Sequence, residues 1–407
     1  MSLVKAPIKD FALGIYDGPH ATPKEATEGH IFLGIKNVTP EGRLDFSQIK
    51  YVSDEEFPKW TRRVTPQAGD VVFSYEATLH RYAVIPEGFD GCLGRRMGLV
   101  RPDRTKLLPR YLHYYFLSPI WQRYLETKVI TGATVNRLPI KDFPSFLVTV
   151  PTLSEQARIV EILSAYDDLI ENNRRRIQLL EESARLLYQE WFVHLRFPGH
   201  EHVKVVDGVP EGWRNSNIAD FASVKSGYAF KSSDWQESGN PVIKIKNIGN
   251  NYDVNIDDCQ CVNDNIAAKA SRFELQTDNL LIAMTGATVG KIGFMPRTNT
   301  KYYLNQRTGV FVPVDKDLTL YLFCALAADT SQSMIDNLAA GAAQPNISGK
   351  QIESIPLLTP STTTLNAFIE AVKPAFAQRQ TLIEMNGKLA QARDLLLPRL
   401  MNGELTP

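Results

Sequence analysis

The sequence predicts an α+β fold with two globular α/β domains in tandem repeat, separated by two long helices that form an antiparallel coiled coil. Three observations lead to this class. The chain repeats itself at a period near 210 residues, each half contains short β-branched and aromatic runs between turn residues, and a heptad pattern follows each half. We expect a first domain over 1–151, a first helix over 152–197, a second domain over 198–360 and a second helix over 361–407.

The repeat is a collinear series of matches. Phe11-Ala12 recurs as Phe221-Ala222, and Ile35 to Val38 recurs as Ile245 to Ile248, both displaced by 210 residues. Later matches keep the displacement between 209 and 211, and they pair Ala77-Thr78 with Ala287-Thr288, Arg96 with Arg307, Tyr111-Leu112 with Tyr321-Leu322, Gly132-Ala133 with Gly341-Ala342, and Pro151 with Pro360. Such a series predicts two copies of one domain.

Composition limits the possible classes of function. With 407 residues, of which 43% are hydrophobic, the chain can form two or three folded domains. Lys and Arg together number 45, as do Asp and Glu, so any nucleic-acid surface is local or shared with a basic partner. The sequence has neither an apolar run of about 18 residues nor the apolar core of a signal peptide, which predicts a cytoplasmic protein without a membrane partner.

A heptad pattern that starts after Leu153 predicts the first long helix, with Ser154 in the expected N-cap and first turn. The seam residues recur at alternating spacings of four and three, at Ile159, Leu163, Tyr166, Ile170, Asn173, Ile177, Leu180, Ala184, Leu187 and Trp191. Asn173 is the one strongly polar member of this set. In a coiled coil such a residue more often fixes register and partner number than contacts a ligand.

Displacing this seam by 209 residues predicts the second helix, with Phe368, Val372, Ala375, Arg379, Leu382, Asn386, Leu389, Arg393, Leu396 and Leu400 on its seam. Pro374 interrupts the pattern, so we expect a kink or a late helix start there. The simplest arrangement is an antiparallel pair that holds the two domains apart, which suits a target with two separated half-sites.

Catalytic and metal-binding motifs are not convincing anywhere in the sequence, so we expect no catalytic residue, metal or cofactor. Gly286 to Ile292 resembles a phosphate-binding loop but has three residues between its glycines and no Ser or Thr after Lys291, so a tight turn is the better interpretation. His200-Glu201-His202 is best interpreted as solvated loop. Cys92, Cys259, Cys261 and Cys324 form no CxxC pair, which predicts neither zinc nor disulfides.

Several stretches resemble the specificity subunit of type I restriction-modification systems over nearly the whole chain. They are Leu153 to Val160, Asp168 to Asn173, Leu186 to Phe192 and Leu397 to Leu405. The segment from Ser361 to Leu365 departs from that family's pattern, which predicts a weaker start for the second helix.

The resemblance implies a noncatalytic protein with two target recognition domains, each of which reads one half of a bipartite, asymmetric site in double-stranded DNA. It also implies two modification (methyltransferase) subunits and restriction/translocase subunits as partners, docked on the helices. S-adenosylmethionine, ATP and Mg are then expected on those partners. A coiled-coil adaptor whose domains bind protein is the alternative, and an autonomous methyltransferase is a third, weaker one.

Four loops in each half carry the polar residue types that contact DNA. The first half offers Lys36, Asn37, Thr78, Arg81, Arg95, Arg96, Asn136 and Arg137, the last two in the segment that begins at Thr134. The second half offers Lys246, Asn247, Thr288, Lys291, Asn305, Gln306, Arg307, Gln344, Asn346 and Lys350. The first two loops are alike in both halves and suit phosphate contacts, whereas Arg95-Arg96 against Asn305-Gln306 and Val135 against Gln344 differ and suit base readout. Each loop also has a plainer interpretation as a turn or a solvated surface.

Overall fold

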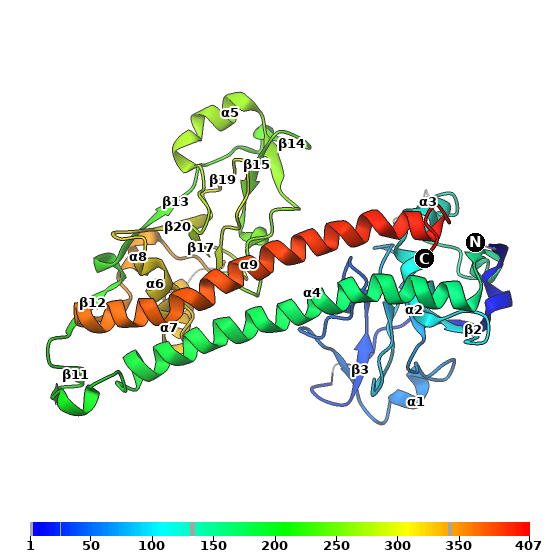
Figure 1. Ribbon diagram of the computed structural model, residues 1–407, viewed down its shortest axis with the longest axis horizontal. Coiled ribbons are helices and arrows are strands. Elements are labelled where there is room, and N and C mark those ends of the chain that lie inside the picture. Colours follow the sequence, from blue (N-terminus) through cyan, green and yellow to red (C-terminus); the bar gives the residue numbers. More distant parts are fainter. Residues whose placement is uncertain (1–2, 25, 131–134, 341–343) are drawn as a thin grey trace. The chain divides into compact units, whose positions relative to one another are not determined.

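A computed structural model describes residues 3–24, 26–130, 135–340 and 344–407. The chain forms two compact units (Figure 1): unit 1 is Met1–Ile170 with Gly387–Pro407, and unit 2 is Glu171–Asn386. Gly132-Ala133, Thr134 and Gly341-Ala342, which the sequence places in matching loops, lie outside the described residues. No helix in the described part of the chain is both long and apolar enough to cross a membrane.

Unit 1 is built on a four-stranded antiparallel sheet with strand order β2-β8-β5-β6. A smaller sheet, β4-β3-β7, contains the parallel pair β3 and β7, and β1 pairs with β9. The strands are β1 Val4–Pro7, β2 Ala12–Asp17, β3 His30–Leu33, β4 Tyr51–Val52, β5 Val71–Ser74, β6 Tyr82–Val84, β7 Gly91–Leu93, β8 Met97–Pro102 and β9 Leu147–Val150, and the short helices are α1 Phe57–Trp60, α2 Pro109–Leu117 and α3 Pro119–Glu126. Phe73, Tyr82, Phe116, Trp121 and Phe143 form an aromatic core between the larger sheet and α2 and α3.

Unit 2 repeats this plan, with a four-stranded sheet β13-β20-β17-β18 and a smaller sheet β14-β16-β15-β19 in which β15 and β19 are parallel. Two further strand pairs are β10-β11 and β12-β21. The strands are β10 Val205–Val206, β11 Val209–Pro210, β12 Arg214–Asn217, β13 Ala222–Ser226, β14 Trp235–Gln236, β15 Asn240–Ile243, β16 Gln260–Val262, β17 Leu280–Ala283, β18 Ile292–Phe294, β19 Tyr303–Leu304, β20 Thr308–Pro313 and β21 Pro356–Thr359; the helices are α5 Asp264–Lys269, α6 Leu318–Leu326, α7 Asp329–Ala339 and α8 Gly349–Glu353.

The four-stranded sheet β2-β8-β5-β6 of unit 1 has the same strand order as β13-β20-β17-β18 of unit 2, which confirms the predicted tandem α/β domains. The two units also match at individual turns. Left-handed residues recur at displacements of 209 or 210, pairing Gly42 with Tyr252, Gly69 with Asp278, Ala77 with Gly286 and His80 with Gly290. The two glycines of the apparent phosphate-binding loop therefore occupy positions of positive φ, at 81° and 84°, in a turn between strands.

Two long helices, α4 Leu153–Tyr188 and α9 Thr362–Met401, complete the fold, and a π-helical turn, Gln189–Val193, continues α4. The cap of α4 is Thr152 rather than the expected Ser154, because Thr152 and Glu155 exchange side-chain and backbone hydrogen bonds. The Ser361 Oγ accepts a hydrogen bond from the Thr364 N–H at 3.2 Å and thereby caps α9. The expected late start at Pro374 is therefore wrong.

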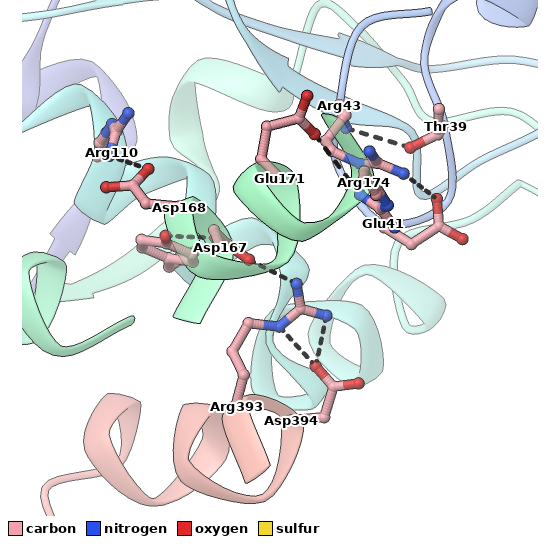
Figure 2. A network of polar contacts seen from close by, with 11 residues as sticks. Thr39, Glu41, Arg43, Arg110, Asp167, Asp168, Glu171, Arg174, Arg393 and Asp394 are labelled. Carbon is pink, nitrogen blue, oxygen red and sulfur yellow. Dashed lines mark hydrogen bonds and ion pairs between the residues drawn. The ribbon is translucent and has the colours of Figure 1, made fainter. Parts of the chain in front are cut away.

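The helices pair antiparallel in each unit, as predicted. In unit 1, Ile159 and Leu163 of α4 share a core with Leu397 and Leu400 of α9. Arg393 donates a 2.6 Å hydrogen bond there to Asp167 (Figure 2). In unit 2 the Asn173 amide donates to Asn386 Oδ1 at 2.9 Å, and the rings of Phe192 and Phe368 lie 5.0 Å apart. Residues later in the chain on the first helix thus contact residues earlier in the chain on α9, as in an antiparallel pair.

The buried stripe of α4 drifts from the predicted heptad after Ile177. Glu181, Ala184, Tyr188 and Phe192 are buried there. The expected seam residues Leu180, Leu187 and Trp191 are only partly buried, as is Tyr166 nearer the helix start. The stripe moves because an α-helix has 3.6 residues per turn instead of the 3.5 of a strict heptad. On α9, Leu382 is buried, whereas Asn386, Leu389 and Leu396 are partly buried.

One partly buried histidine should make unit 1 sensitive to acid. Burial lowers the pKa of His113, on α2, to about 4 from an ordinary 6.5. The unfolded chain therefore takes up the proton first as pH falls, and this group alone should lower the free energy of unfolding by about 1 kcal/mol between pH 7 and 5.5. Urea denaturation of His113→Gln should show a correspondingly smaller pH dependence. The exposed His202→Gln is the control, and equal slopes for both variants would contradict the assignment.

Candidate functional site

Two predicted loops of unit 1 meet because they follow parallel strands. β3 and β7 pair in register to Leu33 and Leu93, so the segments that continue from them leave the sheet at the same end. The Gly94 N–H donates to Leu33 O at 2.8 Å, and a Cβ on Gly94 would lie 2.6 Å from that oxygen. A glycine at this position thus brings the loop with Lys36 beside the loop with Arg95.

The other two predicted loops of unit 1 join the same end through backbone hydrogen bonds. The Tyr75 N–H donates to Arg96 O at 3.1 Å, and the Ala77 N–H donates to Asn136 O at 3.0 Å. The Leu138 N–H closes the arrangement by donating to Tyr75 O at 2.7 Å. We call segments 34–37, 75–81, 94–96 and 136–138 loop cluster 1.

Unit 2 contains the same cluster, held by the same hydrogen bonds at displacements of 209 to 211. Asn305 N–H donates to Ile243 O at 3.0 Å, Met284 N–H to Arg307 O at 3.0 Å, Gly286 N–H to Pro345 O at 2.9 Å and Ile347 N–H to Met284 O at 2.9 Å. Segments 244–247, 284–291, 305–307 and 344–347 form loop cluster 2. The predicted loops thus fall into two clusters, one in each unit, except that Lys350 lies outside cluster 2 on α8 and Thr134 lies outside the described residues.

Asn37 and Asn247 hold these loops from within. The Asn37 Oδ1 accepts from the Gly34 N–H at 3.0 Å, and its Nδ2 donates to the backbone oxygens of Asp45 and Gln48 at 3.1 and 3.0 Å. Asn247 makes the corresponding bonds to Lys244, Asn255 and Asp258 at 3.0, 3.0 and 3.1 Å. Both residues are buried, so their side chains support the loop while the adjacent Lys36 and Lys246 are exposed.

The remaining predicted side chains of cluster 1 differ in how accessible they are. Thr78, Arg95, Asn136 and Arg137 are exposed, and Arg81 is partly exposed. Arg96 is partly buried, has a φ of 72° and pairs with Glu76 at 3.0 Å. Arg95 is therefore the more accessible guanidinium of the pair.

Besides Lys246, the exposed predicted residues of unit 2 are Gln306, Arg307, Gln344, Asn346 and Lys350. Asn305 is buried, and its Oδ1 accepts from the Arg307 N–H at 3.2 Å. Thr288 and Lys291 are partly exposed, and Lys291 donates to Asn250 Oδ1 at 2.6 Å. Lys246 pairs with Asp258 at 2.9 Å, and Lys350, at the start of α8, pairs with Glu353 at 2.8 Å.

A fifth segment of each cluster was missed by the sequence reasoning. The Gly18 N–H donates to Met97 O at 2.9 Å and the Gly227 N–H to Thr308 O at 3.2 Å. Gly18 brings Asp17 and its ion-pair partner Arg63 to cluster 1, while Gly227 brings Tyr228, whose backbone bonds Leu304 and Gln306, to cluster 2. The glycine match at a displacement of 209 was visible in the sequence and could have identified both segments.

The clusters offer hydrogen-bonding side chains on an accessible surface. Within the residues that the structure describes, no group of three or more His, Cys, Asp or Glu side chains could hold a metal ion. Arg, Asn, Gln and Lys side chains supply donors, and the amides supply acceptors, in a form that suits recognition of a polar polymer.

Comparison with known proteins gives a consistent family. The model of the type I restriction modification DNA specificity domain matches residues 36–182 and 210–368. The MjaIX specificity subunit of a type I restriction enzyme from Methanocaldococcus jannaschii is 23% identical, over 96% of this chain and 87% of that protein. The HindI specificity subunit from Haemophilus influenzae is 22% identical, over 83% of this chain and 86% of that protein.

Among solved structures, the S subunit of a type I restriction-modification system from M. genitalium matches with a TM-score of 0.52 and 16% identity. The match covers 98% of this chain and 96% of that one. This likeness supports the fold described above.

Because the buried amides support the loops, Asn37→Ala and Asn247→Ala should each lower the free energy of unfolding by about 2 kcal/mol, since each removes hydrogen bonds of a buried side chain. Lys36→Ala and Lys246→Ala are the neighbouring controls and should change it by less than about 0.5 kcal/mol. Urea denaturation measures both. Equal losses for the Asn and Lys variants would mean that the amides have no special structural role.

Proposed function

We propose, given that this chain belongs to the type I restriction modification DNA specificity domain family, that it is the noncatalytic subunit that reads DNA for a restriction-modification complex. Each loop cluster would read one half of a bipartite, asymmetric site. Modification subunits bound to the chain would supply adenine methylation with S-adenosylmethionine, and restriction/translocase subunits would use ATP and Mg.

The observation that carries this proposal is the contrast between frame and side chains in the two clusters. Both clusters are held by matching backbone hydrogen bonds, yet Arg95 is matched by Gln306, at a displacement of 211. Arg pairs best with guanine and Gln with adenine in the major groove. Two such clusters on one chain therefore suit two different half-sites.

Lys36 and Lys246 occupy the same place in both clusters and suit contacts to phosphate, which carries no sequence information. Each phosphate contact releases a counterion, so its loss weakens binding to all sequences and reduces the salt dependence. These two lysines therefore separate positioning on DNA from base reading.

Methylome sequencing of the source cell, with and without the gene, tests the proposal. We expect a bipartite methylated-adenine motif that disappears on deletion. A motif that persists would contradict the proposal. A mobility-shift assay of the chain with its partners separates DNA reading from the alternative of an adaptor that binds only protein.

Substitutions in the two clusters should relax different halves of that motif. Arg95→Ala should weaken discrimination in one half and Gln306→Ala in the other, each by about 1–3 kcal/mol in competition binding assays with mismatched sites. Arg96→Ala and Arg307→Ala should also weaken DNA binding. Lys36→Ala and Lys246→Ala serve as controls. Each should reduce affinity for every DNA sequence and should reduce the slope of log affinity against log salt concentration by about 1. Identical effects of Arg95→Ala and Gln306→Ala on both halves would argue against separate reading.

Partner docking has its own support in the helices. Leu186 on α4 is 53% exposed and Leu395 on α9 is 65% exposed. Leu186 and Leu395 are 209 residues apart, so they occupy equivalent positions on the two repeated helices. Leu186 lies in unit 2 and Leu395 in unit 1. We assign each as a contact for one modification subunit, because a repeated exposed apolar residue on a helix suits a repeated protein partner.

Leu186→Glu and Leu395→Glu should each remove one of two bound modification subunits, and the double variant should remove both. Light scattering of the purified complex reports the stoichiometry. Leu13→Glu, at another exposed leucine, is the control. Two modification subunits retained by the double variant would place the docking surface elsewhere.

A further inference from the structure

One buried arginine joins three segments of unit 2. Arg379, on α9, has a side chain that is 4% exposed, and its Nε donates to Glu181 Oε1 on α4 at 2.5 Å. A terminal nitrogen of the same guanidinium donates to Tyr252 O at 3.2 Å and pairs with Asp253. Both long helices and a loop of the second domain are therefore held by one side chain.

That loop, residues 249–255, is attached in turn to loop cluster 2. The Lys291 Nζ donates to Asn250 Oδ1 at 2.6 Å. The Asn255 N–H donates to Asn247 O at 2.7 Å, and Asn247 Nδ2 donates back to Asn255 O at 3.0 Å. Lys291 and Asn247 belong to two different loops of the cluster, so the 249–255 loop links both of them to Arg379.

The loop is held in a conformation that its own sequence does not favour. Tyr252 has a φ of 53°, where the first copy has Gly42. Such a backbone is costly for a bulky residue and persists only when its surroundings fix it. Here Tyr252 O accepts from the Phe294 N–H at 2.8 Å as well as from Arg379, and the Tyr252 ring meets Phe323 edge-on at 4.9 Å.

Stabilisation of the fold does not by itself explain why an arginine is buried at position 379. Burial raises the pKa of Glu181 above its ordinary value although Arg379 acts in the opposite direction. An ion pair with this desolvation cost is often replaceable by apolar residues without loss of stability. An apolar pair at positions 181 and 379 could not make the contacts that Arg379 makes with Tyr252 and Asp253.

We propose that Arg379 is a positioning residue for DNA reading by unit 2: it fixes the 249–255 loop to the helix pair. It thereby sets the placement of segments 244–247 and 284–291, and the Met284–Arg307 hydrogen bond passes this placement to the segment of the base-reading Gln306. This inference rests on the proposed function, because it assumes that cluster 2 reads DNA. It assigns to a seam residue of α9 an effect on one half-site only.

The decisive variant is the full-length double substitution Glu181→Leu with Arg379→Leu, which removes both buried charges together. The variant should fold, because no unpaired charge remains between the helices, and Asp253, which loses Arg379, has a side chain that is 46% exposed to water. Hydrogen exchange of the amides in 249–255 should become about tenfold faster or more, since the loop loses its anchor. Asp253→Ala provides a milder second variant that leaves the Arg379–Glu181 pair intact and should give the same change in smaller measure.

The functional readout is the methylation motif in cells that express the variant with its partners. We expect degeneracy in the half read by cluster 2 and an unchanged other half. The matched control is Asp167→Leu with Arg393→Leu in unit 1, where Arg393 donates a hydrogen bond to Asp167 (Figure 2). Asp167 also accepts a hydrogen bond from Tyr114 Oη at 2.5 Å. That control should leave the cluster 2 half intact.

The outcomes distinguish a failure of the proposed role of Arg379 from a failure of the proposed function. Wild-type exchange in 249–255, or a wild-type motif in the Glu181/Arg379 double variant, would overturn the role of Arg379. Equal degeneracy in both halves would also overturn it, because a general loss of structure predicts that result. Absence of any bipartite motif with the wild-type chain would instead overturn the proposed function, and this inference with it.

Discussion

The ion pair between Arg379 and Glu181 is the interaction that sets the register of the helix pair in unit 2 and, through Tyr252 and Asp253, the position of the 249–255 loop. Both side chains are 4% exposed, so neither charge has water as an alternative partner. A slip of either helix would leave two buried charges unpaired, which typically costs several kcal/mol. The bond between Asn173 and Asn386 acts in the same way two turns along. In unit 1, Arg393 and Asp167 provide a polar pair, so each unit fixes its own register.

The sequence predicted the repeat, the antiparallel helices and the central amides, because these follow from local spacing. It did not predict that Glu181 and Tyr188 would replace Leu180 and Leu187 as buried residues. A heptad assigned from leucines assumes 3.5 residues per turn, whereas this helix drifts at 3.6. A buried Glu is also recognisable only once its partner across the seam is known. The cap of α4, by contrast, is predictable from the sequence, because Thr152 has Glu155 at the spacing of a capping box, and the choice of Ser154 overlooks this spacing.

For the candidate site, the sequence identified the loops but not the task of each side chain. Judged by residue type alone, Asn37 and Lys36 are equally good candidates for DNA contact. In the structure the Asn37 amide points inward and forms hydrogen bonds with three backbone groups. An Asn after a strand is equally common as a loop support and as a surface ligand, and only tertiary hydrogen bonds distinguish the two. Asp17 and Arg63 were missed because they are 46 residues apart and meet only in the folded domain.

The hydrogen bonds of the loop clusters explain how two copies of one domain can differ in what they recognise. Most of the bonds that join the loops run between backbone groups, which do not depend on side-chain identity. Arg95 in one copy and Gln306 in the other can therefore project from loops that are held by matching backbone hydrogen bonds. The buried Asn37 and Asn247, by contrast, are the same residue in both copies because their side chains complete the frame. Separation of a constant frame from variable exposed side chains allows a half-site preference to change while the fold remains stable.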